Sequence, residues 1–233
     1  MVGDVDAERD LAMIEDYFGT IPAGPDFRRE LPQEPAQASE VRVDVPFDAE
    51  PQLYVGYHKP TYPTREAYVM DVISGILTSG RTSRLYRRMV LEDQTAVSVA
   101  SSSSFPGNRE NNLFILYGQP RFPATPADLE TAFYEELERI ASEPVSDSEL
   151  TKVKNQVRAG FIRNLASGRG LASQLAFYEL FLGGWENLED YADTISSVTP
   201  EEIMTVASDV FTENNRTIAT LITEEATSEE AGE

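Results

Sequence analysis

The succession of two hydrophobic periodicities along the chain constrains its fold more than any single motif. Alternating apolar and polar residues predict a half-buried strand, and apolar residues that recur every three or four positions predict an amphipathic helix. The expected elements of the first part are, in order, strands over 41–45 and 53–57, helices over 67–76 and 83–88, and strands over 95–101 and 113–118. Ser79-Gly80 separates the two helices, and the turn-prone segment 105–108 separates the last two strands.

The second part of the chain is predicted to be mostly helical. Two helices are indicated by apolar faces, the first with Leu129, Phe133, Leu137 and Ile140, and the second with Leu150, Val153, Val157 and Phe161. Ser146 with Glu149, and Thr199 with Glu202, have the spacing of capping boxes at helix starts. With a closing strand over 217–222, these elements predict an α+β fold in which one mainly antiparallel sheet is covered by helices on one face.

The two ends of the chain differ from this central region. Val2-Gly3-Asp4 has the pattern of a strand end, and a helix with apolar residues at helical spacing follows it up to Phe18. A Pro-rich run comes next, and the chain ends in a Glu-rich stretch. The expected organisation is the end of a preceding domain over 1–21, a Pro-rich linker over 22–38, the main domain over 39–223, and an acidic disordered tail over 224–233.

The charge balance excludes two classes of partner. Lys and Arg number 19 against 40 Asp and Glu, a formal charge of -21, which would repel nucleic acid and an anionic membrane surface. Because the acidic residues are spread along the chain, we favour a strongly hydrated, salt-adapted surface over a trap for basic peptides. No segment approaches the roughly 20 apolar residues of a membrane span, and the first residues lack the pattern of a signal peptide. We expect a soluble chain, and bacterial cytoplasm and periplasm both stay open.

Few residues are suited to metal or covalent chemistry. The chain has one His and no Cys, and a zinc site needs several such groups converging on one ion. His58, at a predicted strand end before a proline, therefore fits a surface or strand-end role better than that of a ligand. The serine run 101–104 lacks a nucleophile elbow, and no glycine-rich phosphate loop is present. Glu135, Glu136 and Glu138 are assigned to the solvated face of a helix. We expect no metal and no cofactor in this chain.

Three segments resemble one protein family when they are taken together. Residues 76–90, which contain Ser-Arg-Leu-Tyr at 83–86, are similar to a helix, a glycine-containing loop and a second helix of that family. Val2-Gly3-Asp4 with 17–22 resembles the end of the family's first domain, and 197–203 resembles a late helix start. The family is the pitrilysin/insulinase family of zinc peptidases, which includes the mitochondrial processing peptidase, and the order of segments fits it from residue 1 to about 222.

The resemblance implies a peptidase built from two similar halves that close around an unfolded peptide. The family's first half binds zinc through H-x-x-E-H and a more distant glutamate, and this sequence contains neither. The chain is therefore identified as the carboxy-terminal, non-catalytic half, inactive alone, with 1–21 as the end of the catalytic half. The implied partners are the homologous catalytic half, which would hold the zinc in the same parent chain or in a partner chain, and the unfolded peptide; a homodimer is a further arrangement.

The resemblance also points to particular positions. Active members add from the second half an arginine and, seven residues later, a tyrosine, which help to hold the tetrahedral oxyanion. Aligned on Arg84-Leu85-Tyr86, this sequence has Val90 and Val97 at those positions, so the pair is absent. The remaining candidate substrate contacts form a loop that corresponds to one implicated in substrate handling in the processing peptidase, and they are Gly80, Arg81, Thr82, Ser83 and Arg84. The alternative is a plain turn, with Gly80 supplying a positive φ and Arg84 an internal salt bridge.

Two further functions fit the same resemblance. The chain could be a structural subunit, like the family's core proteins of respiratory complexes, or the regulatory partner of a two-chain peptidase. An H-x-x-E-H upstream in the parent reading frame would favour the single-chain peptidase, and its absence would favour either rival.

Overall fold

The computed structural model describes residues 1–25, 34–108 and 111–223. The chain divides into two compact units, one formed by Met1–Ala36 with Ile162–Leu188 and the other by Gln37–Phe161 with Glu189–Glu233. The predicted tail over 224–233 and the middle of the predicted linker over 22–38 lie outside the described residues.

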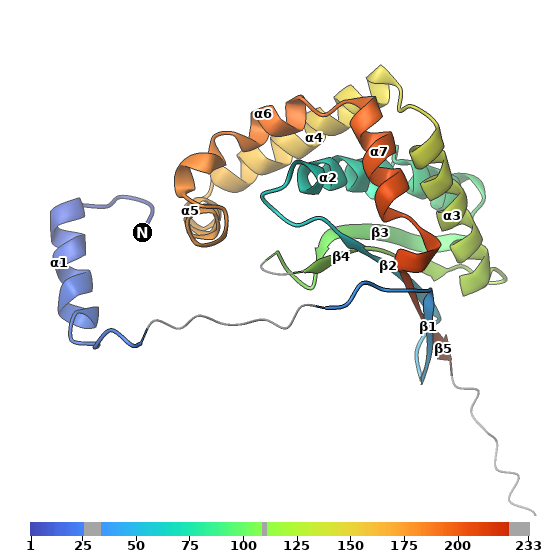
Figure 1. Cartoon of the computed structure of the whole chain (residues 1–233), viewed down its shortest axis with the longest axis horizontal. Helices are drawn as coiled ribbons and strands as arrows, with labels where there is room; N and C mark the ends of the chain where they lie inside the picture. Colours follow the sequence, from blue (N-terminus) through green and yellow to red (C-terminus); the bar gives the residue numbers. More distant parts are fainter. Residues whose placement is uncertain (26–33, 109–110, 224–233) are drawn as a thin grey trace, which may run out of the picture. The chain divides into compact units, whose positions relative to one another are not determined.

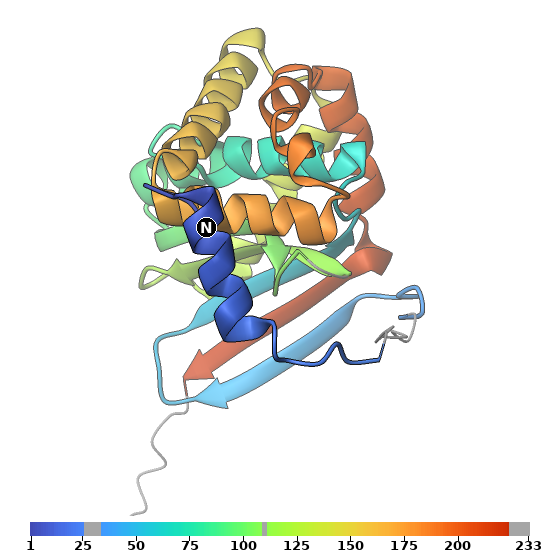
Figure 2. The same cartoon turned by 90° about the vertical axis from the view of Figure 1, so that its left-hand side faces the viewer.

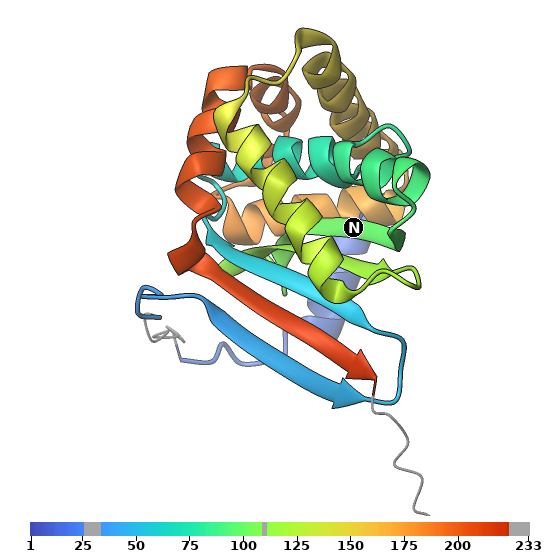
Figure 3. The ribbon, with the colours of Figure 1, turned by 90° about the vertical axis from the view of Figure 1, so that its right-hand side faces the viewer.

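The larger unit is built on a five-stranded sheet. Its strands are β1 (Val41–Phe47), β2 (Gln52–Lys59), β3 (Ala96–Phe105), β4 (Asn112–Pro120) and β5 (Arg216–Thr223). They lie in the order β1-β5-β2-β4-β3, with β1 parallel to β5 and the other neighbours antiparallel. Figures 2 and 3 show β1, β5 and β2 side by side at one edge. The predicted mainly antiparallel sheet is confirmed.

Helices of the same unit cover one face of this sheet. They are α2 (Arg65–Thr78), the π-helix η1 (Tyr86–Glu92), α3 (Pro126–Ser142), α4 (Asp147–Leu165), α6 (Tyr191–Ser196), α7 (Pro200–Val210) and the short 3-10 helix η3 (Glu213–Asn215). Figure 1 shows α2, α3 and α7 on the same side of the strands. The predicted second helix after Ser83 is present, but most of it is a π-helix rather than an α-helix. Among the described residues, no helix is long and apolar enough to cross a membrane.

The hydrophobic core lies between the sheet and these helices. Leu53, Val55 and Tyr57 of β2 alternate toward it and are 0 to 1% exposed. Phe114 of β4 and Phe133 of α3 are also fully buried. The alternation predicted for the second strand is therefore confirmed, because every other residue enters a core made of apolar side chains.

Two sequence expectations about strands are wrong. The first strand, β1, is exposed along its whole length rather than half-buried, because it is an edge strand that pairs only with β5. Gly3 and Asp4 form a bend, Val2 is not in a strand, and no described strand pairs with them. Alternation predicts an extended segment, but burial requires a covering layer. The described part of α3 reaches β1 with the Glu130 carboxylate, which pairs with Arg42, and leaves the strand exposed.

Capping side chains fix the starts of several helices. Thr199 and Glu202 form the predicted capping box of α7, and Thr125 with Asp128 forms a second one at α3 that the sequence analysis did not identify. At α4 only half of the predicted box is formed, since the Glu149 amide donates to Ser146 Oγ at 3.4 Å, while the Glu149 carboxylate binds an arginine described below. Each cap satisfies amide donors that the helix itself leaves unpaired.

The described part of the smaller unit contains the last residues of α4 and three further helical elements. They are α1 (Ala7–Phe18), α5 (Gly168–Phe181) and the short 3-10 helix η2 (Trp185–Leu188). The predicted helix that ends at Phe18 is present, and Asp6 caps it by accepting from the Arg9 amide. Met1 and Val2 line an apolar pocket with Leu175 and Trp185.

Candidate functional site

The loop between α2 and η1 is a tight turn closed by its own serine. Gly80 has a φ of +81°, a conformation that residues with a Cβ rarely adopt. The Ser83 hydroxyl donates to the Gly80 carbonyl at 2.7 Å, and Ser83 is only 2% exposed. Gly80 and Ser83 thus shape the turn, which places the side chains between them at the surface.

Arg81 and Thr82 are the exposed residues of this loop. Lys152 of α4 donates from Nζ to the Thr82 carbonyl at 3.3 Å and to Thr82 Oγ1 at 3.1 Å. Within the described residues, Arg81 makes no hydrogen bond or ion pair. The loop therefore presents one unpaired guanidinium and is attached to α4 through Lys152.

Arg84, at the end of the loop, is held from inside the protein. Its Nε and Nη2 donate to the two carboxylate oxygens of Glu149 at 3.1 and 2.9 Å. The two side chains are 13% and 20% exposed, so the pair is shielded from solvent more than a surface salt bridge is. The third guanidinium nitrogen, Nη1, is buried and has no hydrogen-bond partner among the described residues.

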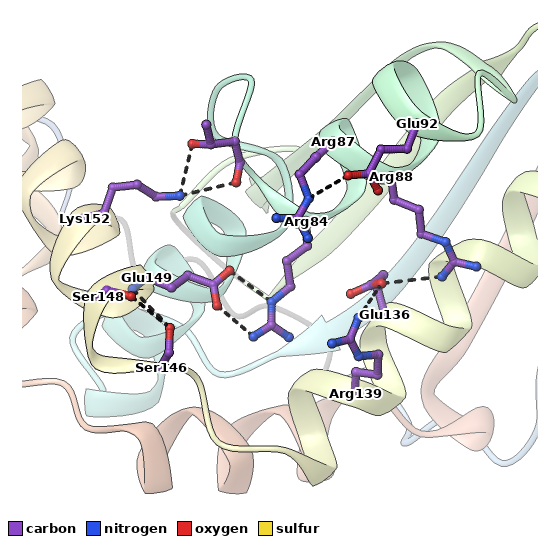
Figure 4. Close-up of a pocket in the computed structure, with 11 residues that line it drawn as sticks. Arg84, Arg87, Arg88, Glu92, Glu136, Arg139, Ser146, Ser148, Glu149 and Lys152 are labelled. Carbon is purple, nitrogen blue, oxygen red and sulfur yellow. Dashed lines mark hydrogen bonds and ion pairs between the residues drawn. The ribbon is translucent and has the colours of Figure 1, made fainter.

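Arg84 lies in a cleft of about 560 Å³ between this loop, η1, α3 and the start of α4, which we call the basic cleft (Figure 4). Its cationic lining residues are Arg84, Arg87, Arg88, Arg139 and Lys152. Its carboxylates are Glu92, Glu136 and Glu149. Cations thus outnumber carboxylates in this cleft, whereas the whole chain carries a formal charge of -21. Arg88 and Arg139 also pair with Asp93, Glu135 and Glu143 just outside this lining. Among the described residues, the groups left to attract an anion are therefore Arg84 Nη1 and Lys152.

Glu136 is the most buried charged group of the basic cleft. Its side chain is 4% exposed, and its Oε1 accepts from Arg139 Nη1 at 3.2 Å and from Arg88 Nη1 at 3.5 Å. Its Oε2 is buried without a hydrogen-bond partner among the described residues. Glu136 is therefore buried and does not lie on the solvated face predicted for it. It is three residues after Phe133 and four before Ile140, so it lies on the apolar face of α3, where helical spacing predicts burial.

Arg88 links the basic cleft to the solvent-facing acids beside it. Burial lowers the pKa of the Arg88 guanidinium, but hydrogen bonding and the charges of Glu135 and Glu136 raise it by more, so its pKa lies above the ordinary value. Arg88 is therefore charged at all physiological pH values. Its two carboxylate partners on α3 hold it at the rim of the cleft.

The positions expected to lack the family's arginine and tyrosine are apolar and lie in different environments. Val90 belongs to η1 and packs partly buried against the core. Val97 belongs to β3 and is 49% exposed. Neither side chain has a hydrogen-bond donor that could reach an oxyanion.

The described residues contain no group of three or more His, Asp or Glu side chains placed to hold a metal ion. His58 lies in β2 one residue before its end, and its carbonyl accepts from Asn215 Nδ2 at 2.7 Å. The serine run belongs to β3, where Ser101 Oγ lies 2.7 Å from Ser74 Oγ and Ser103 Oγ donates to Asp71 at 2.6 Å. These serines hold β3 to α2.

Comparison with known proteins gives a consistent assignment. Residues 1–157 match the family described as the peptidase M16 inactive domain. The chain is 24% identical over 226 residues to the zinc protease PqqE of Helicobacter pylori, covering 93% of this chain and 49% of that protein. It thus spans about half the length of that relative.

Solved structures have the same fold. A protease from Helicobacter pylori superposes with a TM-score of 0.85 at 22% identity, covering 95% of this chain and 54% of that one. A peptidase M16 inactive domain from Pseudomonas fluorescens does so with a TM-score of 0.76 at 18% identity, covering 96% and 53%. The resemblance inferred from the sequence is confirmed, and the chain belongs to the peptidase M16 inactive domain family.

Proposed function

We propose that this chain is the non-catalytic half of a zinc metallopeptidase, in which it pairs with a homologous catalytic half and helps to enclose an unfolded peptide. The observation that carries the proposal is the match of residues 1–157 to the inactive domain of the family. The composition supports it, because one His and no Cys cannot supply a family-type zinc site. Zinc would be bound by the catalytic half and would polarise the peptide carbonyl there.

The uncovered face of the sheet supports the pairing. One row of side chains crosses all five strands on this face and consists of Val43, Ala219, Tyr54, Tyr117 and Ala100. The two tyrosine rings stack with centroids 5.7 Å apart, and Val43, Tyr54 and Tyr117 are 46%, 38% and 37% exposed.

The adjacent row of side chains, on the opposite face of the sheet, is buried. Val55 pairs with Leu116 and Ile218, and all three are 0 to 1% exposed beneath the helices. The described helices of the same unit lie on that side only (Figure 3). An exposed row of aromatic and aliphatic side chains is typical of a protein interface, and we assign this row to contact with the catalytic half.

Within this half, the loop from Gly80 to Arg84 is the proposed substrate-contacting segment. Arg81 is the residue best placed to contact a peptide, because it is exposed and makes no hydrogen bond or ion pair with the described residues. Ser83 would act by holding the loop, since its hydroxyl is bound to the Gly80 carbonyl. Arg84 is held in place by Glu149 through two of its three nitrogens.

Reconstitution tests the proposal. The chain and its cognate catalytic half are purified separately, and zinc-dependent cleavage of an unfolded fluorogenic peptide is measured for each half and for the mixture. We expect the chain alone to be inactive and the mixture to cleave much faster than the catalytic half alone. Tyr54→Glu should prevent association in gel filtration, whereas Phe122→Glu, at a side chain 94% exposed in a loop, should not. Equal cleavage with and without this chain would instead favour a structural subunit.

A further inference from the structure

We propose that the basic cleft binds a carboxylate of the peptide, either its free carboxy-terminus or an acidic side chain. The inference rests on the proposed function, since it names the substrate group that this half would recognise. Its starting observation is the concentration of five of the 19 basic residues of a strongly acidic chain around one cavity of about 560 Å³. That volume is in the range of small-ligand sites.

Two residues that line the cleft each have a buried polar atom without a partner among the described residues, and the two atoms are of opposite kinds. Arg84 Nη1 is a donor, and Glu136 Oε2 is an acceptor. Buried polar groups are nearly always hydrogen-bonded, because leaving one unpaired is costly. A ligand that offers an anionic oxygen next to an N–H group would satisfy both. A peptide carboxylate with the neighbouring backbone amide has this combination.

The donor is held in position before any ligand arrives. Glu149 binds Arg84 through Nε and Nη2, so the planar guanidinium cannot rotate without breaking that pair. Figure 4 shows the Arg84 guanidinium between Glu149 of α4 and the Glu136–Arg139 pair of α3. Nη1 is therefore fixed in orientation in the wall of the cleft, which lowers the entropy lost when it binds an anion.

Two further groups favour an anion at this place. Lys152 hydrogen-bonds to two neutral acceptors of Thr82, and its charge is not matched by a carboxylate within ion-pair distance among the described residues. The 19-residue helix α4 starts at the cleft with Ser146 and Ser148 in its lining. The unpaired amides of its first turn carry a partial positive charge that stabilises an anion.

The three carboxylates of the cleft favour a singly charged ligand. Glu92, Glu136 and Glu149 would repel a phosphate group, which carries more negative charge than a carboxylate. They would also accept hydrogen bonds from the amide groups of a peptide. A carboxylate next to a peptide amide therefore fits the cleft better than a phosphate does.

Binding of labelled peptides to the full chain, followed by fluorescence anisotropy, tests the proposal. One unfolded peptide is made with a free carboxy-terminus, with a carboxy-terminal amide, and with its Asp and Glu replaced by Asn and Gln. At least one of the two changes should weaken binding about tenfold, which corresponds to the loss of one charge-assisted contact. The peptide variant whose binding weakens identifies which carboxylate the cleft binds.

Variants of the chain locate the site. Lys152→Gln should raise Kd about tenfold by removing a charge that pairs with no carboxylate among the described residues. Arg84→Gln with Glu149→Gln removes the free Nη1 donor and keeps the net charge of the cleft, and it should also raise Kd. The matched control is Arg158→Gln, which removes one exposed positive charge from the same helix and should leave Kd within about twofold. Circular dichroism confirms that each variant is folded.

Several outcomes would overturn the inference. Equal binding of all three peptides would show that no carboxylate is recognised, and equal binding by Lys152→Gln and wild type would place the site elsewhere. Inorganic phosphate that binds more tightly than the peptide would reassign the cleft to a phosphate ligand. None of these results decides the proposed function, which is tested by reconstituted cleavage. Conversely, carboxylate binding by a chain that does not accelerate cleavage would leave this inference standing alone.

Discussion

Replacing Arg84 with Gln tests the pair that holds the loop on α4. The change removes two charge-assisted hydrogen bonds of 3.1 and 2.9 Å and leaves the Glu149 carboxylate 20% exposed without its cation. Losing such a pair is expected to lower the free energy of unfolding by about 2–3 kcal/mol. For a chain of this size, that loss corresponds to a decrease in Tm of about 5–10 °C.

A double-mutant cycle measures the pair directly. Urea unfolding followed by far-UV circular dichroism gives the free energy for wild type, Arg84→Gln, Glu149→Gln and the double variant. The double variant should be more stable than the sum of the single losses predicts, because it leaves no buried charge unpaired. If Arg84→Gln stays within about 0.5 kcal/mol of wild type, the pair does not hold the loop, and Glu149 does not fix the orientation of Arg84.

Three further predictions concern the larger unit. Thr199→Ala removes the capping box of α7 and should lower the free energy of unfolding by about 1 kcal/mol, whereas Thr199→Ser should keep it; urea unfolding compares them. Desolvation raises the pKa of the Asp71 carboxyl above 3.8, against hydrogen bonds that lower it. The stability that Asp71 contributes is thus present below its unfolded pKa and lost as the pH rises through its folded pKa. The free energy of unfolding, measured in urea at several pH values, should therefore vary less with pH in Asp71→Asn than in wild type. In Gly75→Ala the new Cβ would lie 2.6 Å from Val153 Cγ1. The substitution should lower the free energy of unfolding by about 1–2 kcal/mol in the wild-type protein and raise it in a Val153→Ala background, where the clash is absent.

Elements with a strong apolar period were predictable from the sequence. Apolar spacing over 67–76 predicts a helix, and α2 occupies Arg65–Thr78. The exposure of β1 was not predictable in the same way, because alternation does not say which strand lies beyond the covering helices. The π-helical form of η1 has no recognised signal in local spacing, since apolar residues predict a helix but not its hydrogen-bond register.

The candidate site was predictable only in part. The loop at Gly80 follows from a break between two helices, but the basic cleft depends on contacts between distant segments. Arg84 and Glu149 are 65 residues apart, and Thr82 and Lys152 are 70 apart. Local patterns do not encode such contacts. Glu136 is the exception, because its place between Phe133 and Ile140 on the apolar face of α3 predicts burial from sequence spacing alone.

Glu149 shows how the stability of the fold and the geometry of the cleft are coupled. Its spacing from Ser146 predicts a capping box, in which its carboxylate would accept from the Ser146 amide. In the structure Ser146 Oγ still accepts from the Glu149 amide at 3.4 Å, but the carboxylate binds Arg84 instead. One amide at the start of α4 thereby loses its side-chain partner, and Arg84 gains a fixed orientation. The exchange weakens a local cap and joins two segments that line the same cleft. Glu149→Gln should therefore change peptide binding as well as stability, although Glu149 need not contact the peptide.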